Sequence, residues 1–186
     1  MLQRIFRIRS DASASVGIED RSTGSRSDVA PRPRLRLTGT MTDLRFSTDP
    51  ADLDVDRVHR WLSEESYWAR GRDRATQDAI IAGSRNFGVY DAVTGEQLGY
   101  ARVVTDGVTF GWLSDVFVAP GARGRGVGVA LVRGVTEAVE ALGLKRFALF
   151  TADAHGLYER FGFRPLPDPE GWMMRPGPGF GDDVHD

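Results

Sequence analysis

Two turn signals divide residues 86–120 into consecutive stretches that have the pattern of β-strands. The turns are the TGEQ segment Thr94–Gln97 and the dipeptide Asp106–Gly107, and the stretches around them are rich in β-branched and aromatic residues. A break near Leu113 and Ser114 predicts a further strand after the third. Since turns this short join antiparallel neighbours, the pattern predicts an antiparallel sheet at the centre of the fold.

The apolar periodicity changes to that of helices on either side of this stretch. The other predicted elements are, in chain order, a strand at 44–47, helices at 54–68 and 74–83, a helix at 128–142 that stops at Gly143, a strand at 146–152, a short helix at 154–161 and closing strands at 162–166 and 172–175. A run of antiparallel strands followed by a β-α-β unit predicts an α/β (α+β) fold, with a mixed, mostly antiparallel central sheet flanked by helices.

The bulk composition is that of one ordinary folded domain. The chain has 186 residues, 41% of them hydrophobic and 27% charged. It has no cysteine, which excludes disulfides and thiolate metal sites, and its three histidines lie too far apart for metal-ligand spacing, so we expect no metal. No apolar run approaches the roughly 20 residues that span a bilayer, so we expect a cytoplasmic protein without a membrane partner.

Charge is distributed unevenly along the chain. Residues 1–40 hold eight arginines against four acidic residues, whereas the remainder holds 16 basic and 22 acidic residues. The first segment is also rich in Ser, Gly and Pro, which predicts a disordered basic extension at 1–40, a folded domain at 41–178 and a flexible acidic tail at 179–186. Met41 is an alternative natural start. The acidic body disfavours nucleic-acid binding by the folded domain, although a basic arm that contacts nucleic acid stays open.

The segment APGARGRGVGVALV at 119–132 combines glycines and arginines between a predicted strand and a predicted helix. A helix N-terminus has unpartnered N–H groups and a positive dipole, glycine allows close approach to a ligand, and arginine adds charge-assisted hydrogen bonds. The segment therefore predicts a phosphate cradle. It does not have the P-loop pattern, because Val127 and Gly128 stand where Lys and Ser/Thr are needed, nor the dinucleotide pattern, which needs glycine at Val129.

The pattern R-x-x-G-x-G, formed by Arg123, Gly126 and Gly128, together with LYERFGFRP at 157–165, resembles the GCN5-related N-acetyltransferases. The resemblance implies the acyl-CoA N-acyltransferase fold, acetyl-CoA as cosubstrate, and a loop whose backbone amides hold the pyrophosphate. The cofactor site that it implies comprises Val116, Phe117, Val118, Arg123, Gly124, Arg125, Gly126, Val127, Gly128, Thr151 and Tyr158. Thr151 stands where the family often has asparagine. We also expect His155 to approach the cofactor, with a purely structural histidine as the alternative.

The reaction that this resemblance implies is acetyl transfer to a primary amine of a small molecule or peptide, by direct attack on the thioester. Because an alkyl amine is protonated at neutral pH, a base or a water chain must remove a proton. Asp115 is the candidate base, with a solvent-facing or turn-capping aspartate as the alternative. The resemblance assigns Tyr158 to the departing sulfur, which its phenol can stabilise by a hydrogen bond, and core packing is the alternative for this side chain.

The acceptor site is less defined by the sequence. Glu64 and Glu65 could meet a cationic acceptor, although a solvated helix face is favoured for them. The segment SYWARGR at 66–72 predicts a pocket edge, whereas Trp61 and Trp112 are predicted to lie in the core. A non-catalytic acyl-CoA sensor of the same fold is the alternative function, and the resemblance leaves a homodimer open.

Overall fold

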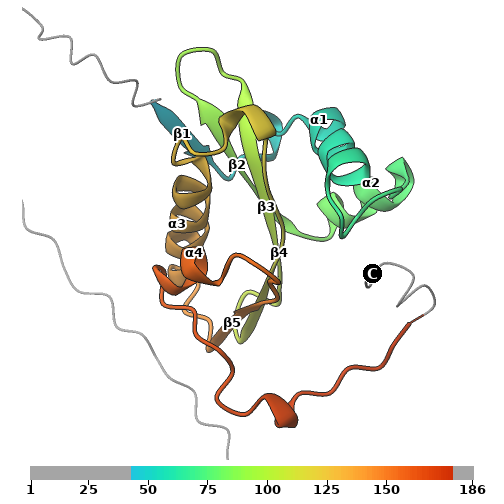
Figure 1. The fold of residues 1–186 in the computed structure, drawn as a ribbon, viewed down its shortest axis with the longest axis vertical. Helices are drawn as coiled ribbons and strands as arrows, with labels where there is room; N and C mark the ends of the chain where they lie inside the picture. The colour runs from blue at the N-terminus through green and yellow to red at the C-terminus, as the bar shows by residue number, and fades with distance from the viewer. Residues whose placement is uncertain (1–42, 178–186) are drawn as a thin grey trace, which may run out of the picture. The chain divides into compact units, whose positions relative to one another are not determined.

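The computed structural model describes residues 43–177, which form a five-stranded mixed sheet with helices on both faces (Figure 1). The strands are β1 (Leu44–Ser47), β2 (Arg85–Asp91), β3 (Gln97–Thr105), β4 (Phe110–Val118) and β5 (Arg146–Leu149). They lie in the order β1-β2-β3-β4-β5, antiparallel except for the parallel pair β4 and β5. The predicted fold class is confirmed. The predicted extension at 1–40 and tail at 179–186 lie outside the described residues.

Four α-helices within residues 43–177 flank this sheet. They are α1 (Val55–Arg60), α2 (Arg74–Ala82), α3 (Val127–Glu140) and α4 (His155–Glu159). The helices α1 and α2 lie on one side of the sheet, and α3 and α4 lie on the other (Figure 1). Asp54 and Asp73 cap α1 and α2, each accepting a hydrogen bond from a backbone N–H of the first turn. Between residues 43 and 177, no helix is both long and apolar enough to cross a membrane.

Helix α3 supplies much of the larger hydrophobic cluster. Leu131, Val132 and Val135 are almost fully buried and belong to one cluster with residues of β2, β3 and β4. Full burial of each such side chain contributes roughly 1.5–3 kcal/mol, so this apolar stripe fixes α3 on the sheet. The helix ends at Glu140, and Gly143 adopts a φ of 66° as the chain reverses toward β5, so the predicted stop is confirmed.

The first predicted helix is shorter than the sequence pattern indicates. Regular α-helix ends at Arg60, a π-helical turn covers Trp61–Glu65, and the chain is extended at Ser66. The side-chain oxygen of Ser66 donates to Leu62 O at 2.7 Å and accepts from the Ala69 N–H at 3.2 Å. Since a serine hydroxyl can replace helical backbone partners in this way, the chain leaves the helix here and forms a loop at 66–73.

The prediction of two closing strands at 162–166 and 172–175 is wrong, because neither segment joins the sheet. The strand predicted at 146–152 ends earlier, at Leu149. Pro165 has no N–H to donate to a sheet ladder. Phe163 instead packs its ring against Phe147 and Tyr158, with centroid distances of 5.2 and 5.8 Å. The break predicted near Leu113 and Ser114 does not end the strand either, because β4 continues to Val118.

Helix α3 approaches β1 so closely that Gly134 contacts the ring of Phe46 at the position where a Cβ would lie. We expect Gly134→Ala to lower the free energy of unfolding by about 1–3 kcal/mol, because overpacking outweighs the gain of about 1 kcal/mol in helix propensity. Urea unfolding measures the difference. Gly156→Ala in α4 is the matched control, since a Cβ there meets no atom within 4 Å. Equal stabilities of the Gly134→Ala variant and the wild type would contradict this packing.

Candidate active site

The strands β4 and β5 run side by side for only part of β4. Their parallel pairing covers Phe110–Leu113 and Arg146–Leu149, after which β5 ends and β4 continues to Val118. Within the described residues, no strand pairs with the β5-facing edge of residues 114–118. A backbone edge of this kind presents N–H and C=O groups that an extended ligand can pair with, as an added strand would.

A β-bulge distorts the other edge of β4 at the same level. The register shifts between Tyr100 and Arg102, so that Asp115 and Val116 both fall opposite one residue of β3. Asp115 has a φ of 51°, the one positive φ among the described non-glycine residues. As a result the side chains of Ser114 and Asp115 both reach the α1–α2 face of the sheet, where Arg102 contacts each of them.

Asp115 is the centre of a buried ion cluster with two arginines. Its side chain is 2% exposed, and its Oδ2 accepts hydrogen bonds from Arg102 Nε at 2.7 Å and Arg72 Nη1 at 2.9 Å. Trp68 Nε1 donates to Oδ1 at 3.2 Å. Burial alone would raise the pKa of Asp115, but the hydrogen bonds and charges of Arg72 and Arg102 outweigh it and hold the pKa below its usual range. The solvent-facing alternative for Asp115 is therefore wrong.

Further hydrogen bonds fix the loop at 66–73 that carries Trp68 and Arg72. The Arg72 carbonyl oxygen lies 2.9 Å from His59 Nε2, and the Gly71 N–H donates to Ser63 O at 2.9 Å. Arg72 Nη1 also donates to Gln77 Oε1 at 3.0 Å. The loop is thus tied to α1, to α2 and to the bulge of β4. The sequence pattern singled out the segment SYWARGR but gave no signal that Arg72 and Arg102 would share one carboxylate.

A cavity of about 270 Å³ opens where β4 and β5 diverge, and we call it the β4–β5 pocket. It is lined by Tyr67, Trp68, Trp112, Leu113, Ser114, Asp115, Val116, Leu149, Phe150, Thr151, Asp153, Ala154 and Tyr158. Of the predicted site residues, the structure brings together here Asp115, Val116, Thr151 and Tyr158. The predicted pocket edge at 66–72 contributes Tyr67 and Trp68.

Other aromatic and acidic residues lie where their sequence positions predicted, with one exception. Trp61 is buried and stacks on Phe117 at a centroid distance of 5.5 Å, as expected of a core residue. Trp112 was also expected in the core but lines the β4–β5 pocket. Glu64 and Glu65 are exposed and do not line this pocket, which agrees with a solvated face.

Tyr158 extends from α4 to the pocket and is 8% exposed. Burial raises the pKa of its phenol to about 12, and the negative charge of Asp153 adds to this effect. The phenol is therefore neutral at physiological pH and can donate a hydrogen bond.

The two other predicted site residues near α4 are Thr151 and His155. Thr151 Oγ1 accepts a hydrogen bond from the Ala154 N–H at 3.1 Å, so this side chain supports the start of α4. His155 lines an adjoining cavity of about 210 Å³ together with Thr151 and Tyr158.

The glycine-rich loop leads from the end of β4 into the first turn of α3. Gly126 is the N-cap of α3 with a φ of 82°, and no side chain caps the helix. A Cβ placed on Gly124 or Gly126 would meet no atom within 4 Å, whereas one on Gly128 would contact Val118 at 3.6 Å. Because the first N–H groups of a helix lack internal partners, Val127 and Gly128 present donors beside open space. The loop is thus suited to a pyrophosphate.

The two arginines of this loop make contacts within the protein. Arg123 Nε donates to the Val118 carbonyl at 3.2 Å, and its guanidinium lies 5.8 Å from the centre of the Phe117 ring. Arg125 Nη2 lies 4.0 Å from Asp91 Oδ2. Both side chains are exposed, so both can turn toward an anion at the start of α3.

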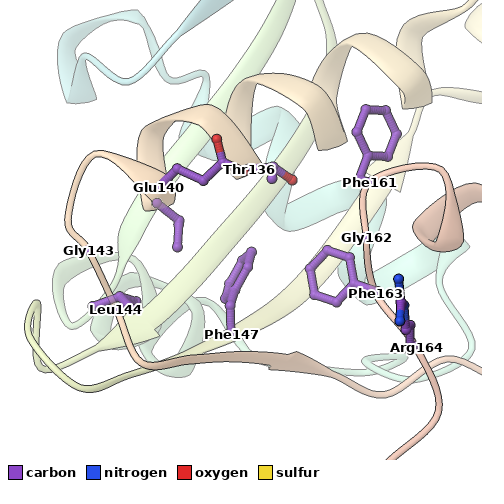
Figure 2. A pocket seen from close by; sticks show the side chains of 10 residues that line it. Thr136, Glu140, Gly143, Leu144, Phe147, Phe161, Gly162, Phe163 and Arg164 are labelled. Carbon is purple, nitrogen blue, oxygen red and sulfur yellow. The ribbon is translucent and has the colours of Figure 1, made fainter.

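A larger cavity, of about 390 Å³, lies between the C-terminal end of α3 and the 161–164 segment (Figure 2). Phe147, Phe163 and Leu144 give it apolar walls, and Glu140 and Arg164 are its charged residues. It contains none of the predicted site residues. The smaller β4–β5 pocket is therefore the candidate active site, because it joins the open edge of β4 to Tyr158.

The ion cluster gives a stability prediction. We expect Asp115→Asn to lower the free energy of unfolding at pH 7 by about 3 kcal/mol, since two partly buried guanidinium groups lose their counter-ion while asparagine tolerates the positive φ. Because folding depresses the pKa of Asp115, its contribution is present above the unfolded pKa near 4 and is lost as pH falls through the folded value. Unfolding curves should therefore differ most above about pH 5 and converge in stronger acid. A pH-independent difference would contradict the ionised cluster.

Three known proteins are similar to this chain in sequence or fold. A solved structure of a candidate GNAT-family acetyltransferase from Xanthomonas campestris matches with 43% identity and a TM-score of 0.68, covering 74% of this chain and 95% of that one. A candidate acetyltransferase of Gibberella zeae is 34% identical over 64% of this chain and 77% of its own length. Rv2747 from Mycobacterium tuberculosis, solved with CoA, shares the fold at 18% identity, with a TM-score of 0.54 over 66% of this chain and 72% of its own.

The family model of the acetyltransferase (GNAT) family matches residues 55–163, which include α1, the sheet from β2 to β5, the glycine-rich loop and Tyr158. The matched region thus contains every element that forms the β4–β5 pocket. The chain belongs to the GNAT acetyltransferase family.

Proposed function

We propose that this protein is an N-acetyltransferase that moves the acetyl group of acetyl-CoA to a primary amine. The observation that carries the proposal is that the glycine-rich loop follows the unpaired end of β4, and that the same stretch of β4 lines the β4–β5 pocket beside Tyr158. Rv2747, which shares the fold, was solved in complex with CoA, and this supports a CoA-type cosubstrate in the proposal.

The chain offers each part of acetyl-CoA a matching group. The N–H groups at the start of α3 and the arginines Arg123 and Arg125 suit the pyrophosphate. The free backbone edge of Val116–Val118 suits the amide groups of the pantetheine arm, because the ladder positions facing β5 are unfilled there. Arg123 would release the Val118 carbonyl when it turns to a phosphate. The residues present therefore fit the cosubstrate.

When bound, acetyl-CoA supplies a thioester carbonyl that a neutral amine can attack, so that a C–N bond replaces the C–S bond. The chain contributes a backbone N–H near Val118, on the diverging end of β4, that can stabilise negative charge on the carbonyl oxygen. Tyr158, which stays protonated with its pKa raised to about 12, can donate a hydrogen bond to the departing sulfur. Asp115 acts as a positioning residue in this proposal, since Arg72 and Arg102 occupy the carboxylate that a base would need.

A non-catalytic acyl-CoA sensor is the second candidate function. It would use the same loop and strand edge, and the aromatic wall of the β4–β5 pocket, formed by Tyr67, Trp68 and Trp112, would then serve no ligand. Turnover of acetyl-CoA in the presence of an amine separates the two functions.

The cofactor site is tested by calorimetric titration of the full chain with acetyl-CoA. We expect micromolar binding, and at least about 100-fold weaker binding by Gly126→Asp, because a carboxylate would face the pyrophosphate at the start of α3. Gly107→Asp is the matched control, since Gly107 also has a positive φ and open surroundings but lies in the turn at the opposite end of β4. No binding by the folded wild type would refute the proposal.

The role of Tyr158 is tested with Tyr158→Phe. We expect kcat to fall by about 100-fold with little change in the Kd of acetyl-CoA, because the ring keeps its packing and only the proton donor is lost. Steady-state kinetics with an amine that the wild type accepts, beside calorimetry, measure both quantities. An unchanged kcat would mean that Tyr158 serves packing alone. Because the phenol has a pKa of about 12, its ionisation should not limit the wild-type rate below about pH 11.

A further inference from the structure

The charges around the β4–β5 pocket are not balanced evenly. Its lining contains two carboxylates, Asp115 and Asp153, and no lysine, arginine or histidine. The charge of Asp115 is already matched by Arg72 and Arg102. Their guanidinium groups lie on the α1–α2 face of the sheet, and neither residue lines the pocket. Asp115 therefore has no free charge to offer a ligand.

Asp153 is in the opposite situation. Its side chain is exposed at the β5 side of the pocket, and within residues 43–177 it forms no hydrogen bond or ion pair. Its charge nevertheless acts on Tyr158, the residue beside the proposed reaction centre. Asp153 is thus the carboxylate of this pocket that is available to a cation.

The remaining walls favour a slender, apolar and cationic occupant. Tyr67, Trp68 and Trp112 supply aromatic surface, and the Tyr67 and Trp68 rings meet edge to face at 4.9 Å. A cation near such faces gains about 0.5–2 kcal/mol. The volume of about 270 Å³ lies at the lower limit for ligand pockets and must also admit the acetyl group, which excludes a bulky acceptor.

The positions of the ion cluster and of Asp153 would also orient a charged acceptor in the pocket. The ion cluster of Arg72, Arg102 and Asp115 carries a net charge of +1 on the β3 side of β4, whereas Asp153 carries its negative charge on the β5 side. An acceptor with an anionic group would meet the unpaired Asp153 and be repelled, so the same carboxylate selects against acidic amines.

We infer that the acceptor is a small aliphatic amine with a second ammonium group, and that Asp153 binds this second group while the first amine attacks the thioester. The inference rests on the proposed acetyl transfer and names its substrate class. Each turnover forms one C–N bond and breaks the C–S bond. Of the two protons that the attacking ammonium loses, one passes to solvent and the other protonates the departing thiolate.

Three acceptors of equal length test the inference with the full chain: pentylamine, 1,5-diaminopentane and 5-aminopentanoate. They differ only in the charge at the far end, which is neutral, positive or negative. We expect kcat/KM to be about tenfold higher for the diamine than for pentylamine, mainly through KM, and lowest for the amino acid. The preference should weaken as salt is raised, because Asp153 is exposed.

The variant Asp153→Asn should bring the ratio of diamine to pentylamine close to one, and Asp153→Glu should keep part of the preference. Glu137→Gln, which removes an exposed carboxylate on α3 away from the pocket, is the control and should keep the wild-type ratio. A merely structural role for Asp153 would lower both rates together and leave the ratio unchanged, which would overturn the inference.

Two other outcomes would also overturn it. Equal use of all three acceptors would show that the far-end charge is not recognised, and acetylation of a lysine-containing peptide without turnover of the diamine would indicate a peptide acceptor. If none of the amines reacts while acetyl-CoA binds and Gly126→Asp abolishes binding, the diamine class is wrong but the cofactor site stands. If acetyl-CoA itself does not bind, the proposed function fails first.

Discussion

The divergence of β4 from β5 after Leu113 is the constraint on which the candidate site depends. Four residue pairs hold the two strands together, and beyond them β4 loses its neighbour on one edge while keeping β3 on the other. An unpaired edge inside a sheet is costly unless something pairs with it. In this fold the edge lies between the glycine-rich loop and Tyr158, so the feature that weakens the sheet is also the one that can bind an extended cosubstrate.

The bulge at Asp115 makes this divergence compatible with a stable core. By adding one residue to β4 opposite β3, it turns Asp115 to the α1–α2 face while Val116 and Val118 still pack on the α3 side. The carboxylate then ties Arg72 and Trp68 of the 66–73 loop to Arg102 of β3. One buried charge thus joins three segments that are distant in sequence, and it does so at the level where the strands part.

Sequence patterns predicted the features that depend on local chemistry. The TGEQ and Asp106–Gly107 turns, the stripe of Leu131 and Val135, and the helix start predicted at 128 after the glycine-rich loop each depend on a few neighbouring residues, and the structure contains them, with α3 beginning at Val127. The end of the first helix at Ser66 and the absent strands after Phe163 were not predictable, because they depend on hydroxyl bonds and on ring packing against distant elements. The sharing of Asp115 by two arginines is likewise a tertiary effect that no spacing indicates.

The same distinction applies to the chemistry of the pocket. By its sequence position Asp115 is the natural base, yet a carboxylate that accepts two guanidinium hydrogen bonds is stabilised as an anion and gains little by taking a proton. Asp153 belongs to no sequence motif, but among residues 43–177 it has no ion-pair or hydrogen-bond partner, and it lies beside Tyr158 in the pocket. Availability to a ligand is decided by what the other residues of the pocket have already bound. On that basis the proposed role of the ion cluster of β4 is to position the site, and the proposed specificity for the acceptor lies on the β5 side.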